Sequence, residues 1–366
     1  MNIESVKNIN DNLLNLYRCF QKRNYNNASE CLDLPSIVSA LKILYKGSSG
    51  QTKTKLKNTA LRQLIKSTPK SMFKRSGIFI RNDLEFNQRF FNKFSSDNLL
   101  AKMPITERQV NDINNLMQKK FNTWPNQEEA FIKNPQSNGY RLYIRNETIF
   151  SQHWSTIFID SYTEKGNFYV GNQIIEKEMM KSDSGEGMLS YKHHNRLRNS
   201  LFVAMPYKGN YNMLIIMPEK PCNKNELLEL INELSGKDIS AFYNELGEYK
   251  YYDKKIMPKF NFKSNWNVDS DNRYTTTCDY LDILFSTNIN MRNICGDFPI
   301  GIERILLQSK TNISNEESGT FVKTETDIFL SDCGIPDPNI LQINKSFIFI
   351  IIDKDRIVNY IGMLVD

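Results

Sequence analysis

The side chains best suited to catalysis or metal binding are few in this sequence and poorly spaced for either role. Its histidines are His153, His193 and His194, and none belongs to a recognisable nucleophile–base arrangement. The adjacent His193-His194 is interpreted as a surface pair. The six cysteines form no C-x-x-C pair and have no nearby histidine, which argues against zinc: Cys19, Cys31, Cys222, Cys278, Cys295 and Cys333. We expect no catalytic residue, no metal and no cofactor.

A long stretch near the C-terminus is the unusual part of the chain. It runs from Asn315 to Asn339, between predicted strands that end near Lys310 and begin near Ile343. Connections of this length inside a compact domain are usually functional or disordered. Its composition is neither Gly/Ser-rich nor highly charged, so a plain linker is the poorer interpretation.

From Thr320 onward this stretch alternates as a strand does. Successive side chains of a strand point to opposite faces. The even positions from Thr320 to Leu330 are all β-branched or aliphatic, and every charge falls on the odd positions. Full burial of Val322, Ile328 and Leu330 would contribute roughly 1.5–3 kcal/mol each before ordering costs. The pattern predicts a loop that can also become a half-buried strand, and an ordinary edge strand remains an alternative.

The rest of the chain supplies the elements that would receive such a strand. Apolar residues at helical spacing predict helices at 3–17, 34–47, 53–66, 84–94, 107–122 and 224–234. Strand patterns dominate from about residue 140, at 141–150, 166–172, 200–206, 213–218, 254–262, 347–352 and 357–365. The fold class is therefore α+β, with a helical N-terminal half followed by large antiparallel or mixed sheets. With no repeat or linker to divide them, residues 1–366 are predicted to form a single domain.

Composition and charge are those of an ordinary globular protein. Charged residues make up 24% of the chain and the formal net charge is +6. Basic clusters at 53–57 and 70–81 leave a glycosaminoglycan partner open, but solvated helix faces with dispersed lysines are the simpler interpretation, and no nucleic-acid partner is expected. The first residues lead directly into an amphipathic pattern, and no apolar run reaches membrane-spanning length. We expect a cytoplasmic protein with no membrane partner, with leaderless secretion as an alternative.

Six short segments follow one another in a recognisable order. They are Pro35-Ser36-Ile37 with Ala40, Leu44, Gly47 and Thr52; the spaced Asn146, Phe150, Trp154 and Phe158; Met213 to Pro218; Met257-Pro258-Lys259-Phe260; Asn315 to Thr320; and Asn344-Lys345-Ser346-Phe347 with Gly362. Each is weak alone, but together they cover nearly the whole chain and resemble the serpin family of protease inhibitors.

This resemblance implies the serpin fold, with an exposed reactive-centre loop at about 316–343 near the C-terminus. It also implies a hinge where that loop begins and a region where the main sheet opens. The implied hinge residues are Glu316, Glu317, Gly319, Thr320, Val322 and Thr324. The implied sheet-opening residues are Ser36, Asn146, Trp154 and Ser309.

The sequence departs from the family pattern at some of these positions. Ser309 stands where the family has a histidine that bonds the serine and asparagine of the opening region. Ser318 is an extra hinge residue, and Lys323 and Glu325 fall where the family has small alanines. These departures keep a second interpretation open, a non-inhibitory serpin-fold protein that acts in binding or as a chaperone.

The mechanism implied by the resemblance is a trap rather than catalysis. A target serine or caspase-like cysteine protease would cleave the loop, form an acyl-enzyme and be held while the loop enters the sheet. The protein would be an inhibitor of enzymes and is expected to be a monomer.

The cleaved bond follows from counting along the loop. Counting from Glu316 places it after Asp332, counting from Gly319 places it after Cys333, and counting back from Asn344 allows Ile335. The run from Phe329 to Cys333 also resembles the bait of the poxviral cytokine response modifier A, in which aspartate precedes cysteine. We expect cleavage at Asp332–Cys333, with Cys333–Gly334 and Ile335 as alternatives. An aspartate would select proteases with a basic primary pocket, namely caspases and granzyme B.

Overall fold

The computed structural model divides the chain into two compact units. The first consists of Met1–Leu34, Phe150–Val268 and Leu307–Asp366, and the second of Pro35–Ile149 and Asp269–Leu306. The structure describes residues 3–21, 28–67, 73–125, 129–136, 142–156, 158–182, 189–192, 197–244, 254–269, 278–284, 286, 289–296, 306–316, 319–322 and 340–366. The single domain expected for residues 1–366 stays a prediction.

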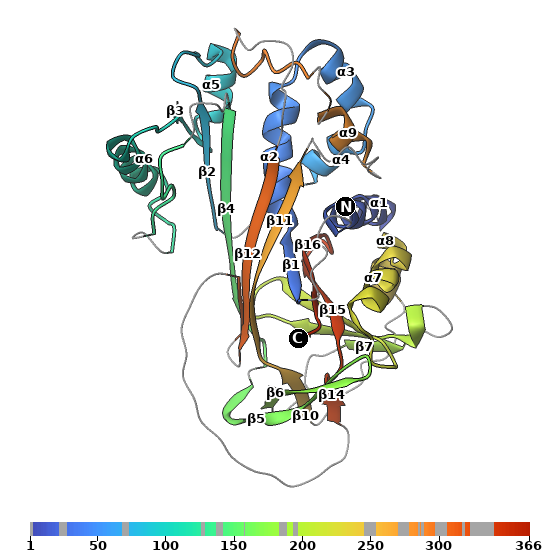
Figure 1. Cartoon of the computed structure of the whole chain (residues 1–366). Helices are drawn as coiled ribbons and strands as arrows, with labels where there is room; N and C mark the ends of the chain where they lie inside the picture. The colour runs from blue at the N-terminus through green and yellow to red at the C-terminus, as the bar shows by residue number, and fades with distance from the viewer. Residues whose placement is uncertain are drawn as a thin grey trace. The chain divides into compact units, whose positions relative to one another are not determined.

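The first unit consists mainly of sheets (Figure 1). A six-stranded sheet has the order β1 (Glu30–Asp33), β16 (Val358–Leu364), β15 (Phe347–Asp353), β9 (Tyr211–Met217), β8 (Leu201–Pro206) and β7 (Leu189–Lys192). A four-stranded sheet has the order β14 (Ile340–Gln342), β10 (Lys254–Pro258), β6 (Gln173–Ser182) and β5 (Ile159–Val170). A third set contains β11 (Phe260–Asp269), β12 (Leu306–Glu316), β13 (Gly319–Val322) and the end of β4 (Leu142–His153). The helical elements of this unit are α1 (Ile3–Gln21), the 3-10 turn η1 (Leu197–Asn199), α7 (Lys224–Glu233) and α8 (Gly236–Asn244).

Strand β15 forms the centre of this unit's core. Its first six residues, Phe347 to Ile352, are all apolar and fully buried, as expected of a strand covered on both faces. It pairs antiparallel with β16 on one side and β9 on the other. At Gly362 of β16, an added Cβ would lie 2.3 Å from both the Phe349 ring and the Glu30 carbonyl oxygen, so only glycine fits.

The second unit carries most of the helices. They are α2 (Leu34–Gly47), α3 (Gly50–Lys57), α4 (Leu61–Lys66), α5 (Gln88–Phe94), α6 (Glu107–Lys120) and α9 (Asp279–Leu284). Strand β2 (Phe73–Ile80) pairs antiparallel with residues 142–149 of β4 and parallel with β3 (Leu99–Lys102). Helix α6 begins with a capping box between Thr106 and Gln109. None of the described helices has the length and apolar composition needed to cross a bilayer.

Most predicted elements appear in place, and the α+β fold class is confirmed. The helix predicted over 53–66 is wrong, because α3 ends at Lys57 and α4 starts only at Leu61. Asn58 leaves the helical conformation between them, with φ −90° and ψ 0°. The strand expected to end near Lys310 runs on to Glu316, because its polar last residues pair through their backbone with β13.

Candidate functional site

The start of the predicted loop lies within a sheet of the first unit. β12 ends at Glu316, and β13 (Gly319–Val322) runs back antiparallel to it, with Thr320 opposite Asn315. On its other edge β13 pairs antiparallel with the end of β4, where Thr320 lies opposite Gln152. The first four residues after the 317–318 connection thus occupy a strand position between β12 and β4.

Thr320 is fully buried in this strand. Beside it lies Tyr207, which follows β8 directly. The Tyr207 ring stacks on Trp154 with centroids 4.4 Å apart and 8° between the ring planes. Phe150 meets the Tyr207 ring edge-on at 5.4 Å. We call Phe150, Trp154 and Tyr207 the aromatic floor of the hinge position.

Backbone hydrogen bonds hold the aromatic floor in place. The Ser155 amide donates to the Pro206 carbonyl at 3.0 Å, and the Lys208 amide donates to the His153 carbonyl at 2.8 Å. These bonds join the end of β4 to the connection between β8 and β9. Main-chain hydrogen bonds therefore help to position Trp154 and Tyr207.

The Tyr207 hydroxyl is the polar group nearest to Thr320 in this floor. Burial raises the pKa of Tyr207 well above its ordinary value, and the Thr320 side chain partly opposes that rise. The hydroxyl is buried and has no hydrogen-bond partner of normal geometry among the described residues. Tyr207 is therefore neutral at physiological pH, and its contact with the Thr320 side chain is one between uncharged groups.

The arrangement is suited to receiving a strand. Both edges of β13 are paired, and its buried Thr320 lies beside the neutral Tyr207. Among the described residues, no group of three or more His, Cys, Asp or Glu side chains could hold a metal ion.

The structure covers part of the predicted hinge. Glu316 is the last residue of β12, and Gly319, Thr320 and Val322 belong to β13. Glu317 and Thr324 lie outside the described residues, as do Asp332, Cys333, Gly334 and Ile335. The assignment of these residues to a hinge and a reactive bond stays a prediction. Within the predicted loop range of about 316–343, residues 319–322 and 340–342 are strands. The range itself stays a prediction.

The predicted sheet-opening residues fall in both units. Ser36 of α2 and Asn146 of β4 belong to the second unit. Trp154, just after β4, and Ser309 of β12 belong to the first. Within the second unit Asn146 accepts a hydrogen bond from the Ser76 hydroxyl at 2.5 Å, across the β2–β4 pairing. Trp154 forms part of the aromatic floor.

Sequence reasoning missed Tyr207. No motif or spacing links it to Thr320, because the two residues meet only through the pairing of β4 with β13 and the anchoring of β4 to the β8–β9 connection. Its position just after a predicted buried strand was the one signal available.

Comparisons with known proteins place these features in a wider group. The family model described as Serpin (serine protease inhibitor) matches residues 8–366. Serine proteinase inhibitor 1 of Variola virus is 23% identical over 359 residues, which cover 89% of either chain. Serine proteinase inhibitor 2 of Vaccinia virus (strain Western Reserve) is 23% identical over 336 residues, covering 89% of this chain and 91% of that relative.

Solved structures agree with the fold. A thyroxine-binding globulin complex with thyroxine matches with a TM-score of 0.73 at 17% identity, over 99% of both chains. At this identity the likeness concerns the arrangement of elements alone.

Proposed function

The chain belongs to the serpin family, and from that membership we propose that it traps a serine or cysteine protease as a covalent acyl complex after cleavage of its loop near Asp332–Cys333. Members of this family are generally protease inhibitors rather than enzymes. The 23% identity to two poxviral inhibitors agrees with such a role.

The observation that carries the proposal is the position of β13. Its four residues already pair on both edges, with β12 and with β4. A loop that is cut farther along could lengthen this strand by adding pairs to an existing ladder. Such an inserted strand would therefore start from residues that are already paired.

The proposed reaction uses the catalytic groups of the target. The protease's serine Oγ or cysteine Sγ attacks the carbonyl carbon of Asp332, and the bond to the Cys333 nitrogen breaks as that nitrogen takes up a proton. The chain up to Asp332 is then held as an ester or thioester. Lengthening of β13 draws the tethered protease away before water can attack the acyl group.

The choice of bond rests on the sequence. An aspartate before the cleaved bond favours proteases with a basic primary pocket, so caspases and granzyme B are the proposed targets. Cleavage at Cys333–Gly334 or after Ile335 would point instead to proteases with uncharged primary pockets.

The alternative function is binding without inhibition. It is favoured by Lys323 and Glu325, which put charged side chains where a longer inserted strand would begin. In that case a protease would cut the loop as a plain substrate, and the cleaved protein would be no more stable than the intact one.

The deciding experiment incubates the purified chain with caspases, granzyme B, cathepsins and chymotrypsin-like proteases. We expect an SDS-resistant complex with at least one of them, a new N-terminus at Cys333, and a higher unfolding temperature for the cleaved protein. The Asp332→Ala variant should lose the complex with Asp-selective proteases. Cleavage without a complex and without added stability, across the whole panel, would reject inhibition in favour of the binding alternative.

A further inference from the structure

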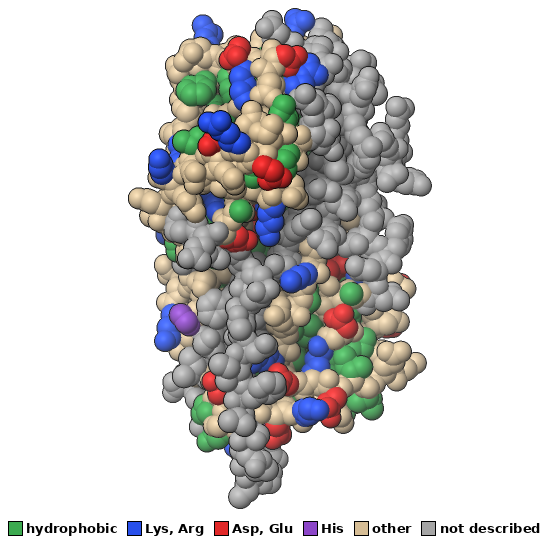
Figure 2. Space-filling model, turned by 60° about the vertical axis from the view of Figure 1, so that its left-hand side comes forward, with side chains coloured by type: hydrophobic (Ala, Val, Ile, Leu, Met, Phe, Trp, Pro, Cys, Tyr) green, Lys and Arg blue, Asp and Glu red, His purple; other side chains and the backbone are tan. Residues whose placement is uncertain are grey.

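The segment between Asp33 and Asp83 contains no acidic residue. Its 49 residues include 11 Lys and Arg residues, and they form α2, α3, α4 and β2 of the second unit. On the face drawn in Figure 2, by contrast, described Lys and Arg side chains are interspersed with Asp and Glu. The segment thus carries 11 cationic side chains and no acidic one.

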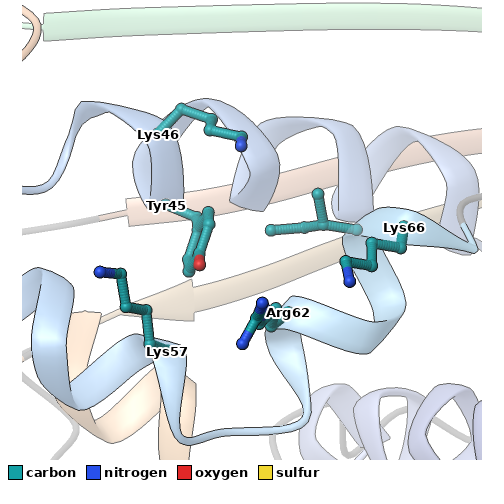
Figure 3. Close-up of a pocket in the computed structure, with 6 residues that line it drawn as sticks. Tyr45, Lys46, Lys57, Arg62 and Lys66 are labelled. Carbon is teal, nitrogen blue, oxygen red and sulfur yellow. The ribbon is translucent and has the colours of Figure 1, made fainter.

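Three of these helices enclose a basic pocket. It has a volume of about 340 Å³ and is lined by Tyr45 and Lys46 of α2, Lys57 of α3, and Arg62, Ile65 and Lys66 of α4. Figure 3 shows the four cationic side chains placed around the Tyr45 ring. Arg62 and Lys66 are four residues apart, so they lie on the same face of α4.

No described carboxylate neutralises this pocket. Lys46, Lys57, Arg62 and Lys66 take part in none of the ion pairs found among the described residues. Burial lowers the pKa of Lys46, and the nearby Lys93 and Lys42 lower it further. Lys46 is therefore repelled by neighbouring cations, and an anion placed beside it would reduce that repulsion.

The helix dipole favours the positions of only three of these four cations. Lys46, Lys57 and Lys66 lie in the last turns of α2, α3 and α4, where cations favourably meet the negative end of the helix dipole. Arg62 lies in the first turn of α4, where the dipole disfavours a cation. Its presence there, facing the other three, is what an anion site would require.

The lining also restricts the class of ligand. Tyr45 is only 6% exposed, and the Lys53 ammonium lies 3.6 Å from its ring centroid, so the ring offers little surface for stacking a nucleobase. No lining side chain is a carboxylate or carboxamide that could accept hydrogen bonds from the hydroxyl groups of a ligand. Recognition would rest on charge, through the point charges of three lysines and the forked guanidinium of Arg62.

We propose that this pocket binds a compact anion carrying two or more phosphate groups, held by Lys46, Lys57, Arg62 and Lys66. Its volume lies at the small end of the range for ligand cavities, about 300–1,000 Å³. Lys46 also lines a second hollow, together with Arg89 and Lys93, which gives room for further phosphates. The site is independent of the proposed protease trap.

The test is calorimetric titration of the full chain with pyrophosphate, tripolyphosphate and inositol hexakisphosphate at 0.15 M salt. We expect 1:1 binding that tightens as the number of phosphates rises. Arg62→Gln and Lys57→Gln should each weaken binding about tenfold, the effect of losing one charged contact of about 1.4 kcal/mol. Lys55→Gln is the matched control, because Lys55 is an exposed residue of α3 outside the pocket lining and removes the same charge. It should change affinity less than twofold.

Two further measurements test whether weaker binding comes from a loss of folding and whether the phosphates bind only by non-specific attraction to positive charge. Thermal unfolding without ligand should show the two pocket variants about as stable as the wild type, because Lys57 and Arg62 are exposed side chains. Heparin oligosaccharides, titrated in parallel, report an extended polyanion surface. The proposal is overturned if none of the phosphates binds at millimolar concentration, if Lys55→Gln weakens binding as much as Arg62→Gln, or if heparin alone binds.

Discussion

Replacing Thr320 with arginine is expected to keep β13 out of its place between β12 and β4, and so to turn the proposed inhibitor into a plain substrate. Thr320 is fully buried, and the residue beside it, Tyr207, is uncharged. An arginine there would have to bury a guanidinium beside the neutral Tyr207. The wild-type threonine buries only a small side chain.

The size of the effect follows from comparing the cost of burying the charge with the stabilisation from the backbone hydrogen bonds of β13. An unpaired buried charge costs several kcal/mol. The backbone hydrogen bonds of the four-residue β13 contribute about 0.5–1.5 kcal/mol each, so the charge outweighs any one of them and rivals their sum. If about 3 kcal/mol of the penalty is felt in the transition state for insertion, insertion slows more than a hundredfold. Hydrolysis of the acyl-enzyme would then be faster than insertion of the loop.

The assay measures how many inhibitor molecules are consumed per protease trapped, with the unfolding temperature of the cleaved protein measured alongside. Thr320→Arg should be cleaved without an SDS-resistant complex and without a rise in unfolding temperature. Thr320→Val is the matched control, since it keeps the β-branched shape without a charge and should behave as the wild type. A Thr320→Arg protein that still trapped protease with wild-type stoichiometry would refute the role given to this position.

Three further predictions concern buried polar groups of the first unit. Tyr207→Phe removes a buried hydroxyl whose contact with Thr320 falls short of normal hydrogen-bond geometry, so urea titration should find the free energy of unfolding within about 1 kcal/mol of the wild-type value. A larger loss would mean that the hydroxyl makes a full hydrogen bond. Burial lowers the pKa of Lys255 to about 8, so the unfolded chain holds this proton more tightly. The stability of the wild type relative to Lys255→Met should therefore rise between pH 8 and 10, by at most about 3 kcal/mol. Parallel pH profiles of the two proteins would contradict this. Glu30→Gln breaks a buried ion pair with Lys224 at 2.6 Å, so thermal unfolding should show a loss of about 3 kcal/mol of stability. Its control, Glu176→Gln, breaks an exposed ion pair with Lys165 of the same length and should cost less than about 1 kcal/mol.

Much of the fold could be predicted from local patterns. The hairpin of β8 and β9, the closing hairpin of β15 and β16, and helix α7 all lie where the spacing of apolar residues placed them. These elements are specified locally, because burial on one or both faces leaves a periodic signature. The break between α3 and α4 leaves none, since Asn58-Thr59-Ala60 contains neither glycine nor proline.

The candidate site was predictable in part. Alternation placed Thr320 on the face to be buried, and it is fully buried. Its partner Tyr207 was not predictable, because contacts between residues far apart in the chain depend on which strands pair. The basic pocket is a similar case: dispersed lysines were interpreted as solvated helix faces, and only the packing of α2, α3 and α4 brings four cations around one cavity.

By itself, then, the sequence determined the class of fold, the order of its family motifs and the two-faced character of the stretch after Thr320, because each of these is written in neighbouring residues. Only the tertiary structure decided that residues 319–322 occupy a strand position beside Tyr207, and that four cations line one pocket. The physical reason is the same for both. Burial and charge act through distances in space, and the chain sets those distances only when its strands and helices have packed.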